Sequence, residues 1–209
     1  MARLLYIEAS PRKDRSSSIA IAKAFIETYR ENHNNGRVEK IDLWQTPLPE
    51  FNDEVINAKY AIYHGREFTE AQKKAWGAVE KVIAQFTGAD RYLISLPMWN
   101  FGIPYKLKQY IDVIVQPGYT FSFSPEEGYK GLVTGKPLAA VYSRAGAYGP
   151  ESGMATYELQ RTYMETVFGF IGLDDFQTIV IEETLGAAEV KDKNLAAARR
   201  LARKIAADF

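Results

Sequence analysis

The fold is decided by the stretch Leu93-Ile94-Ser95-Leu96-Pro97-Met98-Trp99-Asn100-Phe101-Gly102-Ile103-Pro104. An apolar run of strand length ends at Leu96, and a helical pattern begins at the second proline. In an open parallel sheet, ligands bind in the loops that follow the carboxyl ends of the strands. Connecting loops are usually polar, whereas this loop carries Met98, Trp99 and Phe101. A flat, apolar ligand accounts for that composition.

Strand-like and helical patterns alternate along the chain on both sides of this stretch. Apolar runs and period-two patterns predict strands, and apolar residues three and four apart predict helices. The predicted strands are 3–9, 37–44, 91–96, 138–142 and 176–181, and the predicted helices are 17–32, 69–86, 104–116, 154–171 and 189–207. Such alternation is typical of an α/β fold with helices on both faces of a parallel sheet. We expect a flavodoxin-like three-layer sandwich, with a five-stranded parallel sheet in the order 2-1-3-4-5.

Local sequence signals refine these elements. Asn34-Asn35-Gly36 is a typical end of a helix, and Thr69 followed by Gln72 predicts a capping box. Tyr157 is spaced to face the core from the helix 154–171, and Glu182-Glu183 is interpreted as a pair of solvated charges. The segment 117–136 interrupts the alternation, with a period-two pattern at 119–123 and a turn at 125–128. We interpret it as a hairpin-like insertion within a single domain, 1–209.

Composition narrows the classes of function. The 209 residues include 26 Lys and Arg and 26 Asp and Glu, so overall charge favours neither nucleic acid nor an anionic membrane as a partner. No apolar run reaches the roughly 18 residues that span a bilayer, and residues 1–8 do not resemble a signal peptide. The chain has no cysteine and two histidines, so we expect no disulfide, thiolate nucleophile or bound metal. The plain expectation is a cytoplasmic protein.

The loop after the first predicted strand is rich in serine. It reads Ser10-Pro11-Arg12-Lys13-Asp14-Arg15-Ser16-Ser17-Ser18 and leads into a helix. Helix N-termini bind phosphate because they expose unpaired N–H groups and carry partial positive charge. Hydroxyl groups of the four serines and the charge of Arg12 or Arg15 favour a phosphate site. An ordinary N-cap, which needs only one serine, is the alternative.

Two nucleotide-binding motifs are absent or broken. No G-x-G-x-x-G follows the first strand, which argues against a Rossmann dinucleotide site. The run Gly131-Leu132-Val133-Thr134-Gly135-Lys136-Pro137 has too few residues between its glycines for a P-loop, and proline stands in place of Ser or Thr. A serine-rich loop without glycine suits a mononucleotide with a terminal monophosphate.

The loops after the third and fourth predicted strands complete a candidate site. A flavin ring needs an apolar platform and a few well-placed hydrogen-bonding groups, which residues 98–101 offer. The alternative is that Trp99 and Phe101 are core residues that cap the sheet. Gly146 and Gly149 of the loop 143–149 allow the backbone to approach a ligand closely, although this loop also suits a plain turn. In the order 2-1-3-4-5 all three loops converge.

These loops resemble those of one enzyme family. Ser10-Pro11-Arg12 with Ser16-Ser17-Ser18, the run 97–108, and Ser143-Arg144-Ala145-Gly146 are similar to the FMN-dependent NADH-azoreductases and NADH:quinone oxidoreductases. Thr120-Phe121 and the run 131–136 resemble that family's insertion. The resemblance implies a flavodoxin-like homodimer with FMN at the subunit interface. It also implies that the loops hold FMN through Ser10, Ser16, Ser17, Ser18, Met98, Trp99, Asn100, Phe101, Ser143, Arg144, Ala145 and Gly146.

The resemblance also implies a reaction. NADH or NADPH would reduce the flavin and leave, and a quinone or azo compound would then take its place in a ping-pong cycle. Because the flavin performs the chemistry, we expect no catalytic side chain. Tyr119, Phe121 and Phe123 are candidates to line the substrate pocket, from the same or the partner subunit. A flavodoxin-type electron carrier without its own substrate is the alternative function.

Two positions depart from the family pattern. The family more often has Tyr in place of Trp99 and Gly in place of Ala145. Trp99 is expected to reshape the pocket, and Ala145 adds a methyl group near the expected ring.

Overall fold

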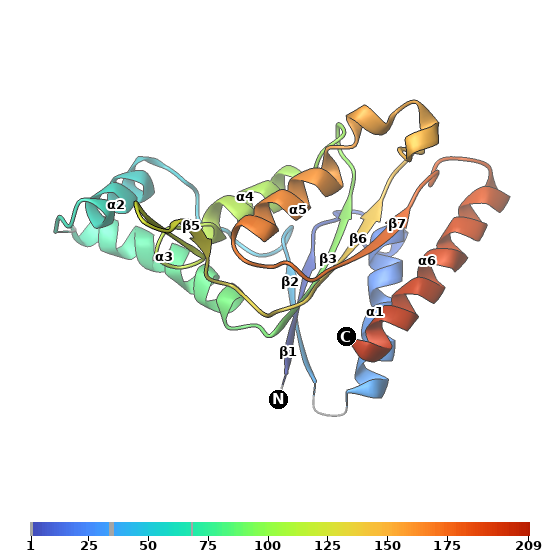
Figure 1. Ribbon diagram of the computed structural model, residues 1–209, viewed down its shortest axis with the longest axis horizontal. Coiled ribbons are helices and arrows are strands. Elements are labelled where there is room, and N and C mark those ends of the chain that lie inside the picture. The colour runs from blue at the N-terminus through green and yellow to red at the C-terminus, as the bar shows by residue number, and fades with distance from the viewer. Residues whose placement is uncertain (1, 34–35, 68) are drawn as a thin grey trace.

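The computed structural model describes residues 2–33, 36–67 and 69–209 and is built on one parallel sheet (Figure 1). Its strands are β1 (Arg3–Glu8), β2 (Arg37–Asp42), β3 (Arg91–Pro97), β6 (Leu138–Ser143) and β7 (Phe176–Ile181). Their order is β2-β1-β3-β6-β7, and every neighbouring pair is parallel. The predicted order 2-1-3-4-5 of the sheet strands and the flavodoxin-like fold class are therefore confirmed.

Burial follows each strand's place in the sheet. β6 is buried along its whole length, and β1 and β3 are buried except at their ends, as expected for strands covered on both faces. The edge strands β2 and β7 are more exposed, and β2 has only two apolar residues, Val38 and Ile41, among four charged ones. The continuous apolar runs thus corresponded to central strands, and the charged run at 37–42 to an edge strand.

Helices cover both faces (Figure 1). On one face α1 (Ser17–Asn32) and α6 (Ala188–Asp208) pack side by side, over a core that includes Leu4, Phe25 and Ala202. On the other face, α3 (Glu70–Thr87), α4 (Tyr105–Ile114) and α5 (Gln160–Phe170) contribute to a core that includes Ile94 and Phe168. None of the helices in the described ranges is both long and apolar enough to span a membrane.

Capping residues start the helices as their sequence indicates. The Ser16 hydroxyl accepts a hydrogen bond from the Ile19 N–H at the start of α1. Thr69 and Gln72 form the predicted capping box of α3. Asn34 and Asn35 of the predicted helix end lie outside the described residues; α1 ends with His33 as its C-cap.

Two helices differ from the sequence prediction. α2 (Asp53–Tyr63), capped by Asn52, was not predicted, because only a narrow apolar stripe that includes Val55 and Ala58 is buried. The helix predicted to begin at 154 begins instead at Gln160. The segment before α5 forms two short 3₁₀ turns, η2 (Pro150–Ser152) and η3 (Ala155–Tyr157). Gly153 lies between them with φ of +69°, a left-handed conformation that does not continue a helix.

The predicted insertion is a two-stranded antiparallel hairpin of β4 (Phe121–Ser124) and β5 (Gly128–Gly131). It lies beside the end of α5, since a Cβ atom on Gly131 would stand only 2.3 Å from the Gly172 nitrogen. Contact this close requires glycine at position 131.

We expect Gly131→Ala to lower the free energy of unfolding by about 2 kcal/mol, because the added methyl group meets backbone atoms that have no room to move. Urea denaturation measures this. Gly77→Ala is the matched control: its Cβ meets open space within α3, so it should stabilise the protein by up to about 1 kcal/mol. Equal stability of wild type and Gly131→Ala would contradict the close packing of the hairpin.

Candidate functional site

Three loops meet at the carboxyl edge of β1, β3 and β6, which are neighbours in the sheet. Backbone hydrogen bonds tie the start of a loop to the neighbouring strand: the Ala9 N–H donates to the Ser95 carbonyl of β3 (2.9 Å), and the Met98 N–H donates to the Ser143 carbonyl of β6 (2.8 Å). In such sheets this edge is where ligands bind. The convergence expected from the strand order is therefore present.

The first loop turns its serines inward around the start of α1. Ser10, Ser16 and Ser18 are buried, and the Ser16 and Ser18 hydroxyl oxygens lie 3.2 Å apart. Ser16 satisfies the Ile19 N–H with its hydroxyl and the Ala20 N–H with its carbonyl. Because a helix's first turn has no intrahelical acceptors, the Ser17 and Ser18 N–H groups are left for an acceptor outside the helix. The capping role of Ser16 is therefore compatible with an anion bound at this helix N-terminus.

The cations of this loop divide into two groups. Arg12 and Arg15 are exposed, whereas the Lys13 ammonium donates to Glu8 Oε1 (3.0 Å) and to the Asp42 carboxylate. Partial burial disfavours the charged form of Lys13, but hydrogen bonds to Asp42 and Glu8 outweigh it and raise the pKa above its usual value. Lys13 is therefore a firmly charged member of an internal ion-pair network.

The second loop is a tight turn with unusual backbone angles. Asn100 and Phe101 have φ of +47° and +69°, as in a type I′ turn. Trp99 and Gly102 exchange N–H to carbonyl hydrogen bonds of 3.1 and 2.9 Å across it. A bulky residue such as Phe101 rarely adopts positive φ, and strain of this kind gathers at functional sites. The turn presents its backbone and aromatic side chains at the sheet edge.

The aromatic side chains of the second loop are partly exposed. Trp99 is 36% exposed and Phe101 is 38% exposed, so the alternative that they are buried core residues is wrong. Trp99 contacts Trp44 and Tyr105, with ring centroids 5.7 and 6.2 Å away. Phe101 packs 5.1 Å from Tyr157. Each ring therefore packs against other aromatic rings and leaves part of its surface exposed to solvent.

The third loop is held by a buried arginine. The Arg144 guanidinium, 5% exposed, donates to Glu158 (2.8 Å), Glu182 (3.1 Å) and Gln160 (3.2 Å). Glu182 also accepts the Tyr148 N–H at 2.9 Å. The interpretation of Glu182 as a solvated charge is wrong, because this carboxylate is a partner of Arg144. The Arg144 side chain thus ties the loop to β7 and to the segment before α5.

The comparisons with known proteins agree with this geometry. A family model described as a flavodoxin-like fold matches residues 2–205. An FMN-dependent NADH:quinone oxidoreductase of Desulfotalea psychrophila is 47% identical over 95% of this chain and 93% of its own length, and one from Nitratidesulfovibrio vulgaris is 42% identical over the full length of both. The chain belongs to this family.

Solved structures of family members are also similar. An azoreductase from Bacillus anthracis superposes with a TM-score of 0.91 at 32% identity, covering both chains fully. An FMN-dependent NADH-azoreductase from the same species, in complex with FMN, gives a TM-score of 0.87 at 30% identity over 99% of this chain and all of the other. The resemblance to the azoreductases and quinone oxidoreductases is thus confirmed.

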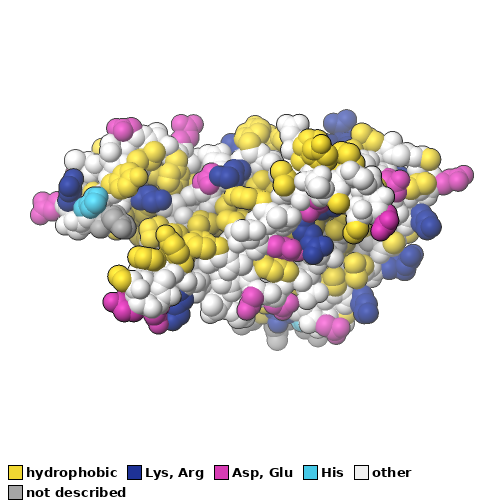
Figure 2. Space-filling model, turned by 45° about the horizontal axis from the view of Figure 1, so that its top comes forward, with side chains coloured by type: hydrophobic (Ala, Val, Ile, Leu, Met, Phe, Trp, Pro, Cys, Tyr) yellow, Lys and Arg dark blue, Asp and Glu magenta, His cyan; other side chains and the backbone are white. Residues whose placement is uncertain are grey.

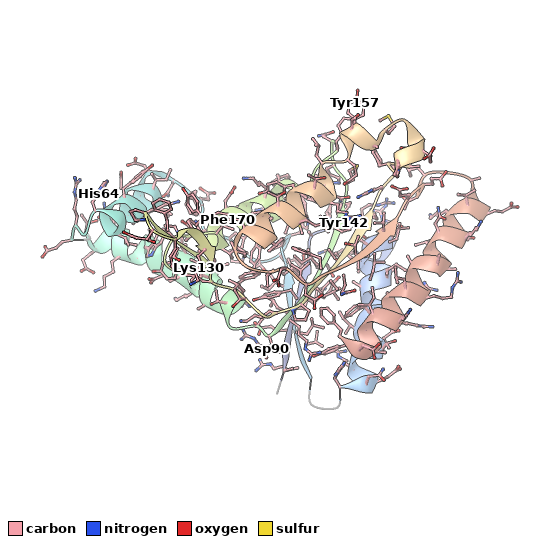
Figure 3. All side chains as sticks on the ribbon, viewed as in Figure 1. His64, Asp90, Lys130, Tyr142, Tyr157 and Phe170 are labelled. Carbon is pink, nitrogen blue, oxygen red and sulfur yellow. The ribbon has the colours of Figure 1, made fainter. Side chains whose placement is uncertain are left out.

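The predicted pocket aromatics lie far from the three loops of this family member. Tyr119 donates to Glu80 (2.6 Å) and accepts from Trp76 (3.2 Å). Phe121 and Phe123 belong to the hairpin, beyond the far end of α4, whose ten residues span about 15 Å. In Figure 3, Phe170 and Lys130 mark the hairpin end, and Tyr157 marks the loop end. One subunit therefore does not bring the two groups together.

A grooved, aromatic surface links these two ends. A hollow of about 580 Å³ beside the second loop is lined by Phe51, Trp99, Tyr105 and Asp112 among others. A second hollow shares Phe51 and Asp112 and continues along α4, and a third of about 600 Å³ lies at the hairpin. Figure 2 shows hydrophobic side chains gathered over α2 and the hairpin, at the left.

Several aromatic residues near the loops and the hairpin were not predicted from the sequence. Trp44, Tyr105 and Tyr157 support the second loop; Tyr157, predicted to face the core, is 49% exposed. Tyr129 and Phe170 extend the hairpin aromatics, with ring centroids 5.6 Å apart. The sequence of β5, GYKG, has no periodic pattern that marks Tyr129. Tyr129 lies with the other hairpin aromatics because β5 pairs it with Phe123. No cluster of three or more metal-binding side chains occurs in the described part of the chain.

We expect Arg144→Met to lower the free energy of unfolding by about 3 kcal/mol, because it leaves the partly buried carboxylates of Glu158 and Glu182 without their partner. Chemical denaturation followed by circular dichroism measures the loss. The control Arg161→Met removes the exposed pair with Glu165 (2.7 Å) and should cost less than about 1 kcal/mol. Similar losses for both variants would contradict a structural role for Arg144.

Proposed function

We propose that this protein is an FMN-dependent oxidoreductase that carries electrons, as hydride, from NAD(P)H to quinones and to azo compounds. The single observation that carries the proposal is the convergence of the three loops at one sheet edge, in a chain whose relatives are FMN-dependent NADH:quinone oxidoreductases. When bound, FMN supplies the hydride chemistry, so the chain itself needs only to bind and orient the reactants.

The residues of the first loop suit the phosphate of FMN. The α1 N-terminus offers the Ser17 and Ser18 N–H groups, and a helix N-terminus favours an anion. Ser10 adds a buried hydroxyl, and Ser16 fixes the start of the helix by capping it. We assign the phosphate to this loop.

The second and third loops suit the flavin ring. Met98, Trp99 and Phe101 offer apolar surface, and Asn100 with the backbone of the strained turn offers polar groups for the pyrimidine edge. Ser143, Ala145 and Gly146 stand opposite on the neighbouring loop. Arg144 belongs to the proposed site as well; since its guanidinium is engaged by Glu158 and Glu182, its part is to hold the loop that faces the ring.

We further propose a homodimer, formed through the grooved surface along α4. Exposed aromatic and aliphatic side chains cluster there, including Tyr105, Phe123 and Tyr129, each at least 60% exposed. An exposed apolar surface of this kind marks an interaction site. A two-fold pairing allows Tyr119, Phe121 and Phe123 of one subunit to approach the ring site of its partner. A cytoplasmic location completes the proposal.

The purified protein is expected to carry a yellow flavin that is released on denaturation and identified as FMN by chromatography. Under anaerobic conditions, NADH or NADPH should bleach its absorbance, and a quinone should restore it with steady-state turnover. Parallel initial-rate lines at several acceptor concentrations would support the ping-pong order. A protein that is reduced but does not turn over with any quinone or azo dye would instead be an electron carrier, and a colourless protein that binds no FMN would refute the proposal.

Charge placed on the hairpin should disrupt the dimer. Phe123→Asp is expected to shift the protein from dimer to monomer in sedimentation velocity, because it buries an unpaired charge in the interface. Leu201→Asp is the control, since Leu201 is also an exposed apolar residue but lies on α6 in the other helix layer. Single alanine variants of Tyr119, Phe121 and Phe123 should alter the steady-state constants for the acceptor. Unchanged constants in all three would exclude them from the substrate pocket.

A further inference from the structure

Lys13 occupies the phosphate loop, but its ammonium group is directed to the sheet. It donates to Glu8 Oε1 at 3.0 Å and to the carboxylate of Asp42. Glu8 lies at the carboxyl end of β1, and Asp42 lies at the carboxyl end of β2. The other carboxylate oxygen of Glu8 pairs with Lys40 at 2.7 Å. One lysine of the loop therefore bridges the ends of two strands.

Glu8, one of the two acceptors of this bridge, is buried and has further partners. Glu8 is 2% exposed, and the Tyr6 hydroxyl lies 3.5 Å from its second oxygen. Tyr6 also contacts the Ser95 hydroxyl at 2.9 Å, so the network reaches β3. A buried carboxylate requires cationic or hydrogen-bonding partners. Glu8 thus anchors Lys13 to a fixed point of the sheet.

Backbone hydrogen bonds connect Lys13 to the N-terminus of α1. Lys13 has φ of +49°, a conformation that persists in a non-glycine residue only where its surroundings hold it. Its carbonyl accepts the Ser16 N–H at 2.9 Å, which closes the 3₁₀ turn η1 (Lys13–Arg15). Ser16 then caps α1 through the Ile19 N–H. The position of Lys13 therefore sets where the first N–H groups of α1 point.

We propose that Lys13 is a positioning residue for FMN: clamped by Glu8 and Asp42, it fixes the phosphate loop and does not itself neutralise the phosphate. This clamp rests on the proposed function. The phosphate charge is met instead by the α1 N-terminus, with Arg12 and Arg15 exposed nearby in the same loop. The clamp makes the loop ready for a phosphate before the flavin arrives.

A direct charge contact and a clamp predict opposite effects of Asp42→Asn. If Lys13 neutralised the phosphate, this change would free its ammonium group and remove a competing negative charge, so FMN would bind more tightly. If Lys13 is a clamp, the change loosens the loop and FMN binds more weakly. Asparagine retains an oxygen for the Trp44 N–H, which Asp42 accepts at 3.1 Å, so the turn after β2 is preserved.

The test is fluorescence titration of the full-length chain with FMN and, separately, with riboflavin, which lacks the phosphate. We expect Lys13→Met to raise the FMN dissociation constant about tenfold, because without the clamp only about a tenth of the chains hold the loop in its binding conformation. Asp42→Asn should raise it in the same direction. Riboflavin affinity should change less than about twofold in both variants, because the ring loops are intact. Lys13→Arg, which keeps a cation for both carboxylates, should recover most of the FMN affinity.

Lys23→Met is the matched control. Lys23 belongs to α1 and forms an exposed pair with Asp14 at 2.8 Å, so its loss removes the same charge near the loop but leaves the clamp intact. Its FMN dissociation constant should change less than about twofold. Thermal melts of each variant establish that it is folded at the titration temperature.

The outcomes separate the two proposals. Unchanged FMN affinity in Lys13→Met, tighter binding in Asp42→Asn, or equal losses in Lys13→Met and Lys23→Met would each overturn the clamp while the flavoenzyme function stands. Parallel loss of riboflavin affinity would also overturn it, since that indicates a general loss of structure. A wild-type chain that binds no FMN would overturn the proposed function, and the clamp with it.

Discussion

The constraint on which the rest of the structure depends is the adjacency of β1, β3 and β6 in one parallel sheet. Because parallel strands all end at the same edge, three loops that are far apart in the sequence are forced together there. The hydrogen bonds from Ala9 to Ser95 and from Met98 to Ser143 tie the starts of two of these loops to the neighbouring strands. The candidate site is a consequence of strand order.

Two cations at this edge of the sheet form ion pairs within the protein. Lys13 and Arg144 both stand in loops of the candidate site, yet each is paired with carboxylates of the protein. Removing a charge from water is costly unless it is paired, so the partly buried Lys13 and the buried Arg144 are each held by nearby acids. The ion pairs of Lys13 and Arg144 therefore hold two of the three loops in place.

Much of the fold was predictable from the sequence because it depends on local pattern. Continuous apolar runs marked the central strands, apolar residues among charges marked β2, and Thr69 with Gln72 marked the start of α3. α2 was missed because its buried stripe is narrow, and the start of α5 was misplaced. Before α5, Gly153 at positive φ and the Glu158 pair with Arg144 favour two 3₁₀ turns, and neither is visible as periodicity.

The sequence by itself determined the alternation of strands and helices and the three loops, because hydrophobic period and turn residues act over short distances; the strand order was expected from what is common in such sheets, and the tertiary structure decided it. Only the tertiary structure decided which side chains face the site and which are used to hold it. Trp99 is partly exposed and packs against Trp44 and Tyr105. Glu182 pairs with Arg144, and Lys13 pairs with Glu8 and Asp42. Several of these pairings join residues far apart in the sequence, such as Trp44 with Trp99 and Glu182 with Arg144, so no local pattern encodes them.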